Sequence, residues 1–143
     1  MTPRRVLLVT DSFPPGAGGS GWSTFELARQ LRNRGHAVQV VHAKPGTVNG
    51  LHRTEYEGVP VTEFRVHVPN VPVLRNVLKN ERLWAALGRY LVTRLAAEPA
   101  DIIHAQHVMT TVPAVRAGRR AGVPVVATVR DYWPVCYWSD LIV

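Results

Sequence analysis

Several features that often define a protein are scarce in this sequence of 143 residues. A single cysteine, Cys136, excludes an internal disulfide and agrees with a reducing compartment. The longest apolar run near the N-terminus, residues 6–9, is far shorter than a signal-peptide core or the roughly 18 apolar residues of a membrane-spanning helix. Charged residues, at 19% beside 46% hydrophobic residues, are too few for a disordered chain. We therefore expect one soluble, cytoplasmic globular domain over residues 1–143.

Acidic residues are scarce as well. The chain has 17 lysines and arginines against 10 aspartates and glutamates, a net charge of +7, and arginine supplies nearly all of the cations. This excess indicates anionic partners, because the planar guanidinium donates two parallel hydrogen bonds to a phosphate. A nucleotide, a phosphosugar and an acidic lipid all fit the charge, and so does a surface of solvated arginines without a ligand. Nucleic acid is the weakest of the candidate partners because no recognised DNA- or RNA-binding motif accompanies the charge.

Short apolar runs alternate with helical patterns along the chain. Strands are predicted at residues 6–10, 37–42, 61–66, 101–104 and 125–129, and the polar segment 52–58 fits either a hairpin or an irregular loop. A first helix is predicted from the capping-box spacing of Ser23 and Glu26 to about Arg34, before Gly35, and a third helix over residues 112–120. A long second helix is predicted from apolar positions at helical spacing, namely Leu74, Val77, Leu78, Trp84, Leu87, Leu91 and Leu95. This alternation predicts an α/β fold, a Rossmann-like three-layer αβα arrangement with a mainly parallel sheet.

A loop rich in glycine and proline, residues 11–21, follows the first predicted strand. Gly16–Gly21 formally satisfies the dinucleotide-binding pattern G-x-G-x-x-G, but its first glycine does not follow the strand directly and no acid follows the second strand. A dinucleotide site is therefore disfavoured, and the absence of a Walker pattern disfavours an ATPase. Free N–H groups before a helix are still suited to bind an anion. A tight turn without a ligand is the structural alternative.

Two further segments follow predicted strands. His104 and His107 lie at and just beyond the end of the fourth strand, and Arg130–Trp133 follows the fifth. An imidazole can bind a sugar hydroxyl or share a proton, and a cation, an acid and two aromatic rings together suit sugars or phosphates. Equally compatible are histidines that satisfy loop backbone and aromatic rings that close the core. A metal site is disfavoured because further ligands are lacking nearby, and Cys136 is interpreted as a structural thiol. The segments 16–22, 104–111 and 130–137 are expected to converge on one crevice.

The long helix carries several cations, namely Arg75, Lys79, Arg82, Arg89 and Arg94. Beside an apolar face, these cations permit peripheral contact with the inner face of an anionic membrane. A solvated basic face on a surface helix is the favoured alternative.

Several segments resemble the N-terminal half of the family-4 retaining glycosyltransferases, which have the GT-B fold. The matching segments are Phe13–Pro15 with Gly18 and Gly19, Leu27–Ala28, Leu31, Arg34–His36, Val38–Val41, Asp101–Ala105 and Thr128–Cys136. The resemblance covers almost the whole chain. It implies transfer of a sugar from a nucleotide-sugar donor to an acceptor hydroxyl, with retention at the anomeric carbon.

The resemblance also implies a division of labour between two domains. The N-terminal domain mainly holds the acceptor, and a C-terminal domain grips the nucleotide and diphosphate through basic residues and a Glu-x7-Glu motif. That donor-binding domain is absent here, and the apolar end of segment 131–143 likewise predicts a chain truncated at its C-terminal end. We therefore expect this chain to be inactive alone, and we expect no metal or other cofactor.

Site residues are carried over position by position. The loop near the donor phosphates and the reacting centre would be Gly18, Gly19, Ser20 and Gly21. Contacts to the acceptor or the sugar would come from Trp22, His104, Gln106, Arg130, Asp131, Tyr132 and Trp133. Gln106 occupies the place of a second family histidine, with His107 next to it, and either residue can contact the donor sugar or the acceptor; the catalytic role is assigned to His107. Arg130 replaces the histidine before Asp131. The alternative function is a stand-alone Rossmann-like module that binds a nucleotide or phosphorylated ligand without catalysis.

Overall fold

The structure, a computed structural model, describes residues 2–69, 75–130 and 132, and for residues 75–79 it describes the backbone alone. Its elements follow the order β1 (Arg5–Thr10), α1 (Gly19–Asn33), β2 (Ala37–Gly46), β3 (Gly50–Tyr56), β4 (Val59–His67), α2 (Arg75–Ala97), β5 (Ile102–Ala105), α3 (Val108–Ala121) and β6 (Val125–Ala127). The expectation that the chain continues beyond Val143 falls on a segment outside the described residues.

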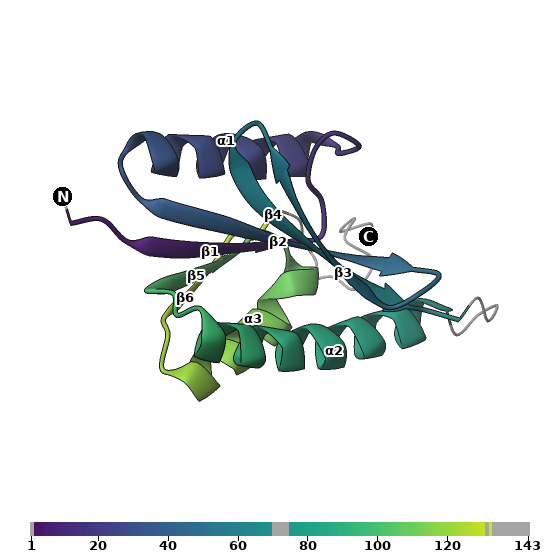
Figure 1. Cartoon of the computed structure of the whole chain (residues 1–143). Coiled ribbons are helices and arrows are strands. Elements are labelled where there is room, and N and C mark those ends of the chain that lie inside the picture. The colour runs from purple at the N-terminus through teal and green to yellow at the C-terminus, as the bar shows by residue number, and fades with distance from the viewer. Residues whose placement is uncertain (1, 70–74, 131, 133–143) are drawn as a thin grey trace.

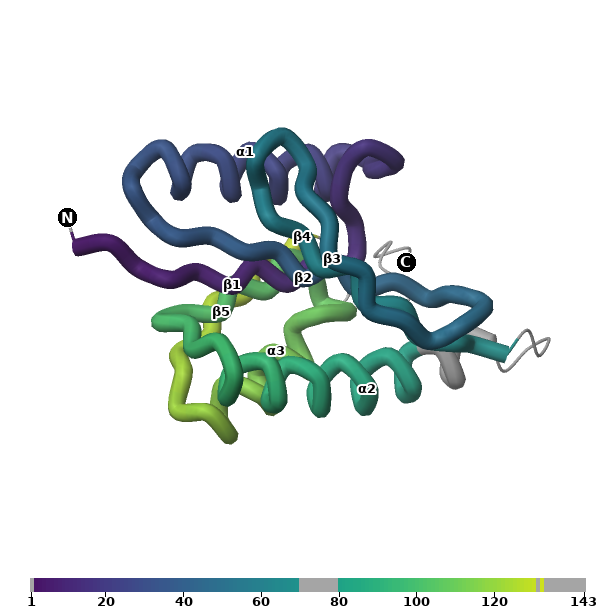
Figure 2. The backbone as a smooth tube through the Cα atoms, viewed as in Figure 1, coloured from purple at the N-terminus to yellow at the C-terminus, as the bar shows by residue number. Residues whose placement is uncertain are grey.

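One mixed sheet organises the fold, with the strand order β3-β4-β2-β1-β5-β6. Every neighbouring pair is parallel except β3 and β4, which are antiparallel. Helix α1 covers one face of the sheet, and α2 and α3 cover the other (Figures 1 and 2). The predicted three-layer αβα fold with a mainly parallel sheet is confirmed.

Strand β1 lies at the centre of the sheet and contributes to both halves of the core. Its side chains alternate, so Val6 and Leu8 pack toward α1, whereas Leu7 and Val9 pack toward α2 and α3. All four are buried, which explains why the sequence shows an uninterrupted apolar run here rather than an alternating one.

The segment between the second and third predicted strands forms a hairpin. Strands β3 and β4 are joined by Glu57 and Gly58, which have φ angles of 45° and 80°, and Tyr56 pairs directly with Val59. A two-residue turn with positive φ at both positions matches the right-handed twist of the strands it joins. Of the two readings left open by the sequence, the hairpin is the one observed.

Helix α1 begins five residues before the position predicted from the capping box. Gly18 is its N-cap, and Ser23 lies inside the helix. The carboxylate of Glu26 does not reach back to a cap but contacts the guanidinium of Arg29 at 2.8 Å. The end of the helix agrees with the sequence, because Gly35 follows it with a φ of 86°.

Helix α3 also begins earlier than predicted, at Val108 rather than Val112, and contains Pro113. A proline inside a helix leaves the carbonyl four residues earlier without its usual donor. Here that carbonyl belongs to Met109, and the indole Nε1 of Trp84 donates to it at 2.9 Å. The indole of Trp84, one of the apolar positions that predicted the long helix, is thus directed toward α3.

Four leucines of α2 form its core face, namely Leu83, Leu87, Leu91 and Leu95. The side chains of Leu74, Val77 and Leu78 lie outside the described residues. Strand β6 ends at Ala127, two residues before the predicted end, and Val129 is exposed.

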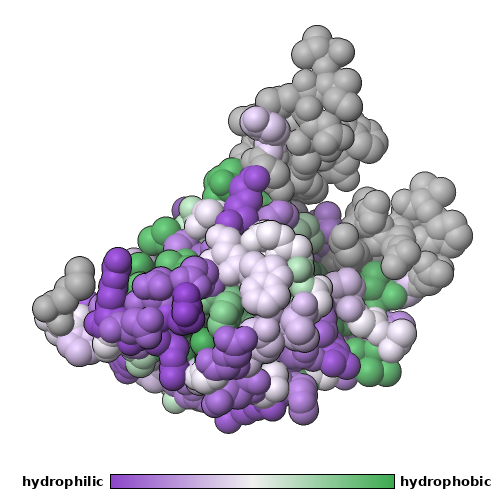
Figure 3. Space-filling view, turned by 90° about the horizontal axis from the view of Figure 1, so that it is seen from above, coloured by the Kyte–Doolittle hydropathy of each residue, from purple (hydrophilic) through white to green (hydrophobic). Residues whose placement is uncertain are grey.

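Figure 3 looks onto the face that carries α1, where hydrophilic side chains are abundant. The exposed residues of this helix include Glu26, Arg29, Gln30, Arg32 and Asn33. The buried ones are Gly21, Thr24, Phe25 and Ala28, which face the sheet.

Candidate functional site

The carboxyl ends of β1, β5 and β6 lie at one edge of the sheet, because these three strands are adjacent and parallel. Asp11 follows β1, Gln106 and His107 follow β5, and Arg130 lies beyond the end of β6. Helices α1 and α3 begin at the same edge, since each follows one of these strands. We call this region the carboxyl edge. In open α/β sheets, it is where ligands bind.

The N-terminus of α1 presents backbone N–H groups at the carboxyl edge. Gly18 accepts hydrogen bonds at its carbonyl from the N–H groups of Gly21 and Trp22, at 3.0 and 3.2 Å. The N–H groups of Gly19 and Ser20 belong to the first turn and have no intrahelical acceptor. A β-carbon added at Gly18 or Gly19 would meet no atom within 4 Å, so space is open beside this backbone. An anion can therefore approach the positive end of the helix closely.

Gly21 serves a different purpose from its neighbours. A β-carbon there would lie 2.4 Å from the Ala17 side chain and 2.8 Å from the Ser12 hydroxyl. The first turn of α1 is thus packed against the loop that follows β1. This loop is anchored by Phe13, which is buried and whose ring makes edge contacts with those of Phe25 and Tyr56.

Arg130 joins two segments of the carboxyl edge. Its Nε donates to the Gln106 carbonyl oxygen at 3.0 Å, and its Nη2 donates to the Gln106 side-chain Oε1 at 2.6 Å. Its Nη1 donates to the Ser23 hydroxyl on α1 at 3.1 Å. The guanidinium thereby ties the segment after β5 to the helix that carries the glycine loop. Gln106 is 1% exposed, and its Nε2 has no hydrogen-bond partner among the described residues.

His107 is the N-cap residue of α3 and lies near an acid. Its Nδ1 is 3.3 Å from the carboxylate of Asp11, which follows the central strand β1. Its carbonyl accepts hydrogen bonds from the backbone N–H groups of Thr110 and Thr111, both at 3.0 Å. The ring lies beside a carboxylate, and the backbone is held by the first turn of the helix. A histidine oriented in this way can bind a hydroxyl or move a proton.

His104 lies inside β5 rather than at its end, and its Nε2 is 2.8 Å from the hydroxyl of Thr128. Burial lowers the pKa of this imidazole below its usual value, and the positive charge of Arg130 lowers it further. The neutral form is therefore favoured, which suits a hydrogen-bonding role more than a charged one.

The remaining predicted site residues are divided between two groups. Trp22 and Tyr132 are both exposed, at 46% and 54%, and the Trp22 ring packs edge-on against Phe25 and Tyr56. Asp131, Trp133 and Cys136 lie outside the described residues.

Sequence reasoning missed three participants in this arrangement. Asp11 had a detectable signal, because it follows the first strand directly. Ser23 and Thr128 had none, since their partners Arg130 and His104 lie 107 and 24 residues away in the sequence.

Among residues 2–69, 75–130 and 132, no group of three or more histidine, cysteine, aspartate or glutamate side chains is placed to hold a metal ion. None of the helices, within the same described ranges, is long and apolar enough to cross a membrane.

Solved structures share this fold. The catalytic domain of starch synthase IV from Arabidopsis thaliana matches with a TM-score of 0.62 and 18% identity, covering 92% of this chain and 35% of that one. MurG from Acinetobacter baumannii matches with a TM-score of 0.53 and 17% identity, covering 90% and 36%. The C-terminal domain of a hydrogenase from Pyrococcus furiosus matches with a TM-score of 0.61 and 14% identity, covering 89% and 92%. The chain thus spans about a third of the two transferase chains and nearly all of the hydrogenase domain.

At these identities the structural matches show the Rossmann-like fold of GT-B domains and no more, and the hydrogenase domain shows that the fold is not confined to one activity. No curated protein matches the sequence. The model of the glycosyl transferase 4-like domain matches residues 18–140. That match begins at the N-cap of α1 and includes the segments after β5 and β6 that form the carboxyl edge. The chain therefore belongs to the family of glycosyl transferase 4-like domains.

Proposed function

We propose that this chain forms the acceptor side of a retaining glycosyltransferase, which moves a sugar from a nucleotide-sugar donor to an acceptor hydroxyl. Membership of the glycosyl transferase 4-like family supports the reaction class. Among the proteins with this fold, starch synthase IV was solved bound to ADP and acarbose, and a Phytolacca americana transferase was solved with UDP-2-fluoro-glucose. The carboxyl edge is the surface on which we place the reaction.

A single observation carries the proposal: an open helix N-terminus and an oriented histidine are held together at one edge. Arg130 hydrogen-bonds both Ser23 on α1 and Gln106, which precedes His107. Open space beside Gly18 and Gly19 leaves room for a diphosphate at the positive end of α1. Arg130 thereby links the helix that carries the proposed anion site to the segment that carries the imidazole, which supports positioning of two reactants at this edge.

The chain's own residues have separate tasks in this proposal. The N–H groups of Gly19 and Ser20 stabilise the negative charge that develops on the leaving diphosphate, without a metal. His107, oriented by Asp11, binds a hydroxyl of the sugar or of the acceptor. His104, whose pKa is lowered, remains neutral and hydrogen-bonds Thr128 behind the reacting groups. Retention at the anomeric carbon then needs no protein nucleophile, because the acceptor attacks from the side of the leaving group.

We further propose that a C-terminal domain supplies the donor-binding half, so that the 143-residue chain alone is inactive. The chain's share of about a third of the matched transferases supports this division. Trp22 and Tyr132, which are exposed, would offer their ring faces to the apolar side of a sugar. The proposed compartment is the cytoplasm, where nucleotide sugars would be the donors.

The test is a transfer assay with the native full-length polypeptide, its intact mass having been measured in source cells. A panel of nucleotide sugars is supplied with hydroxyl acceptors, and release of the nucleoside diphosphate is followed. His107→Ala should lower turnover by about 100-fold or more, whereas the control His52→Ala, on the exposed strand β3, should leave turnover unchanged. Turnover that survives in His107→Ala would overturn the assignment of His107. A native mass of 15.9 kDa together with ligand binding but no transfer would instead indicate a stand-alone binding module.

A further inference from the structure

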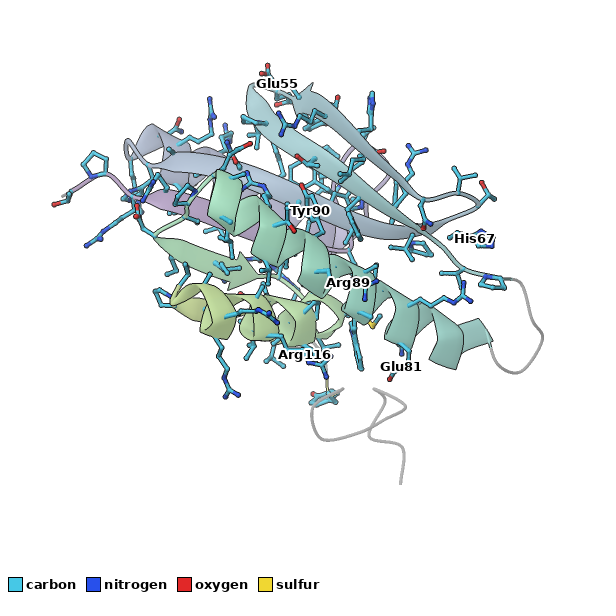
Figure 4. The ribbon with its side chains drawn as sticks, turned by 60° about the horizontal axis from the view of Figure 1, so that its bottom comes forward. Glu55, His67, Glu81, Arg89, Tyr90 and Arg116 are labelled. Atoms are coloured by element: carbon cyan, nitrogen blue, oxygen red, sulfur yellow. The ribbon has the colours of Figure 1, made fainter. Side chains whose placement is uncertain are left out.

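A groove between α2 and α3 lies apart from the carboxyl edge. It has a volume of about 500 Å³, within the size range of small-molecule sites. Its floor is formed by apolar side chains of both helices, Trp84, Val92 and Ala117. Figure 4 shows α2 and α3 side by side on the face of the sheet opposite α1.

The groove exists because of how the two helices meet. Small residues lie where they approach each other, so that a β-carbon added at Gly88 would already stand 3.8 Å from Pro113. The indole of Trp84 on α2 donates a hydrogen bond to the Met109 carbonyl of α3, which holds this lining side chain in place. These contacts are internal to the fold and shape the groove.

The lining of the groove is strongly basic. Arg89 comes from α2, and Arg116 and Arg120 come from successive turns of α3; all three are exposed. Figure 4 labels Arg89 and Arg116 on the two helices. None of the lining residues is an aspartate or glutamate. Among the ion pairs that join described residues, none involves these three arginines, although Arg5, Arg29, Arg53, Arg65 and Arg94 are all paired.

Three like charges around one groove are unfavourable unless something neutralises them. Arginines four residues apart on a helix repel each other, and a third cation faces them from the neighbouring helix. A bound anion would convert this repulsion into attraction, and the guanidinium fork matches the geometry of phosphate oxygens. The apolar floor would meanwhile accept an uncharged group next to the anion.

We infer that this groove is a binding site for a phosphate-bearing ligand, with Arg89, Arg116 and Arg120 as the groups that contact the phosphate. The site shares no residue with the carboxyl edge and does not depend on the function proposed there. The phosphate can be carried by a soluble molecule or by the headgroup of an anionic lipid, and the two sources are separated by experiment.

The test compares two double variants of the 143-residue chain that lose the same charge. Arg116→Ala with Arg120→Ala removes two groove cations, and Arg4→Ala with Arg34→Ala removes two exposed cations that do not line the groove. Pyrophosphate is titrated calorimetrically at fixed salt, because screening weakens any contact between exposed charges. We expect the groove variant to bind about tenfold or more weakly than the unmodified chain, and the control to bind within about twofold of it.

A second arm uses vesicles of phosphatidylglycerol in a sedimentation assay. If the groove variant loses pyrophosphate binding, the result supports a soluble phosphate ligand. If the same variant loses vesicle binding but keeps pyrophosphate binding, the result supports a lipid headgroup. Equal losses in both double variants would show that only net charge matters and would overturn the site. Binding that the groove variant retains in both arms would overturn it as well.

Discussion

Replacing Arg130 by alanine should destabilise the fold by about 2–4 kcal/mol. The guanidinium donates to both oxygen atoms of Gln106, at 3.0 and 2.6 Å, and Gln106 is almost completely buried. Alanine would leave these two acceptors without their donor. Hydrogen bonds to charged groups contribute about 1.5–3 kcal/mol each, and an unsatisfied buried acceptor costs a similar amount. The third bond, to Ser23, is exposed and adds little.

The measurement is urea unfolding of the chain, with stability differences taken from the midpoint at a constant m-value. Arg82→Ala is the matched control, because Arg82 is an exposed arginine whose loss should cost less than about 0.5 kcal/mol. Arg130→Lys should lie between the two, since one ammonium group cannot span three acceptors. A loss below about 0.5 kcal/mol in Arg130→Ala, or a lysine variant as stable as the unmodified chain, would refute the reasoning.

Three further predictions follow from the same structure. Gly21→Ala should lower the free energy of unfolding in urea by about 1–3 kcal/mol, because its β-carbon would overlap Ala17 and Ser12. Gly19→Ala should leave that free energy unchanged or slightly higher, since no atom lies within 4 Å of its β-carbon, and equal effects of the two substitutions on stability would contradict the packing argument. Arg65 and Lys44, at 2.6 and 2.9 Å, lower the pKa of Glu63 to about 2, so the contribution of Glu63 to stability is present above pH 4.5 and is lost as pH falls toward 2. Glu63→Gln should therefore make the unfolding free energy less dependent on pH in this acid range, and an unchanged pH dependence would contradict the role of these two ion pairs. Burial and Arg130 lower the pKa of His104, so the unfolded chain binds the proton more readily and stability falls as pH drops below about 6.5. In Arg130→Ala, an NMR titration should show a higher pKa for His104, and an unchanged pKa would show that Arg130 exerts no such effect.

Much of the fold was predictable because its signals are local. The apolar run of β1 indicates a strand buried on both faces, and Gly35 marks the end of α1 through a backbone conformation that glycine favours. Strand–helix alternation then restricts the sheet to a mainly parallel one. None of these inferences needs a contact between residues that are distant in the sequence.

The starts of α1 and α3 were missed because tertiary contacts override local rules there. Ser23 and Glu26 have the spacing of a capping box, but close packing at Gly21 continues the helix back to Gly19. The third helix was predicted to begin at Val112, next to Pro113, yet it begins at Val108 because the Trp84 indole donates to the carbonyl that the proline leaves without a donor. Such a donor, from a side chain 25 residues away, leaves no trace in the local pattern.

The candidate site shows the same limit. Parallel strands bring their carboxyl ends to one edge, so the meeting of the glycine loop with the segments after β5 and β6 follows from the predicted topology. The detailed contacts do not, because Arg130 finds Ser23 across 107 residues and Gln106 across 24. Only the structure shows that the Arg130 guanidinium links α1 to the segment after β5.

The hydrogen bonds between Arg130 and Gln106 also join two positions at which the sequence departs from the family that it resembles. Gln106 and Arg130 each stand where that resemblance places a histidine, and taken singly each departure weakens the transfer of the histidine's role. In the structure the two residues are direct partners, joined by two hydrogen bonds. The Gln106 amide oxygen accepts a hydrogen bond from the Arg130 guanidinium, which also donates to the Ser23 hydroxyl on α1. The two departures from the family pattern are therefore in direct contact, and the imidazole of the adjacent His107 lies 3.3 Å from the carboxylate of Asp11.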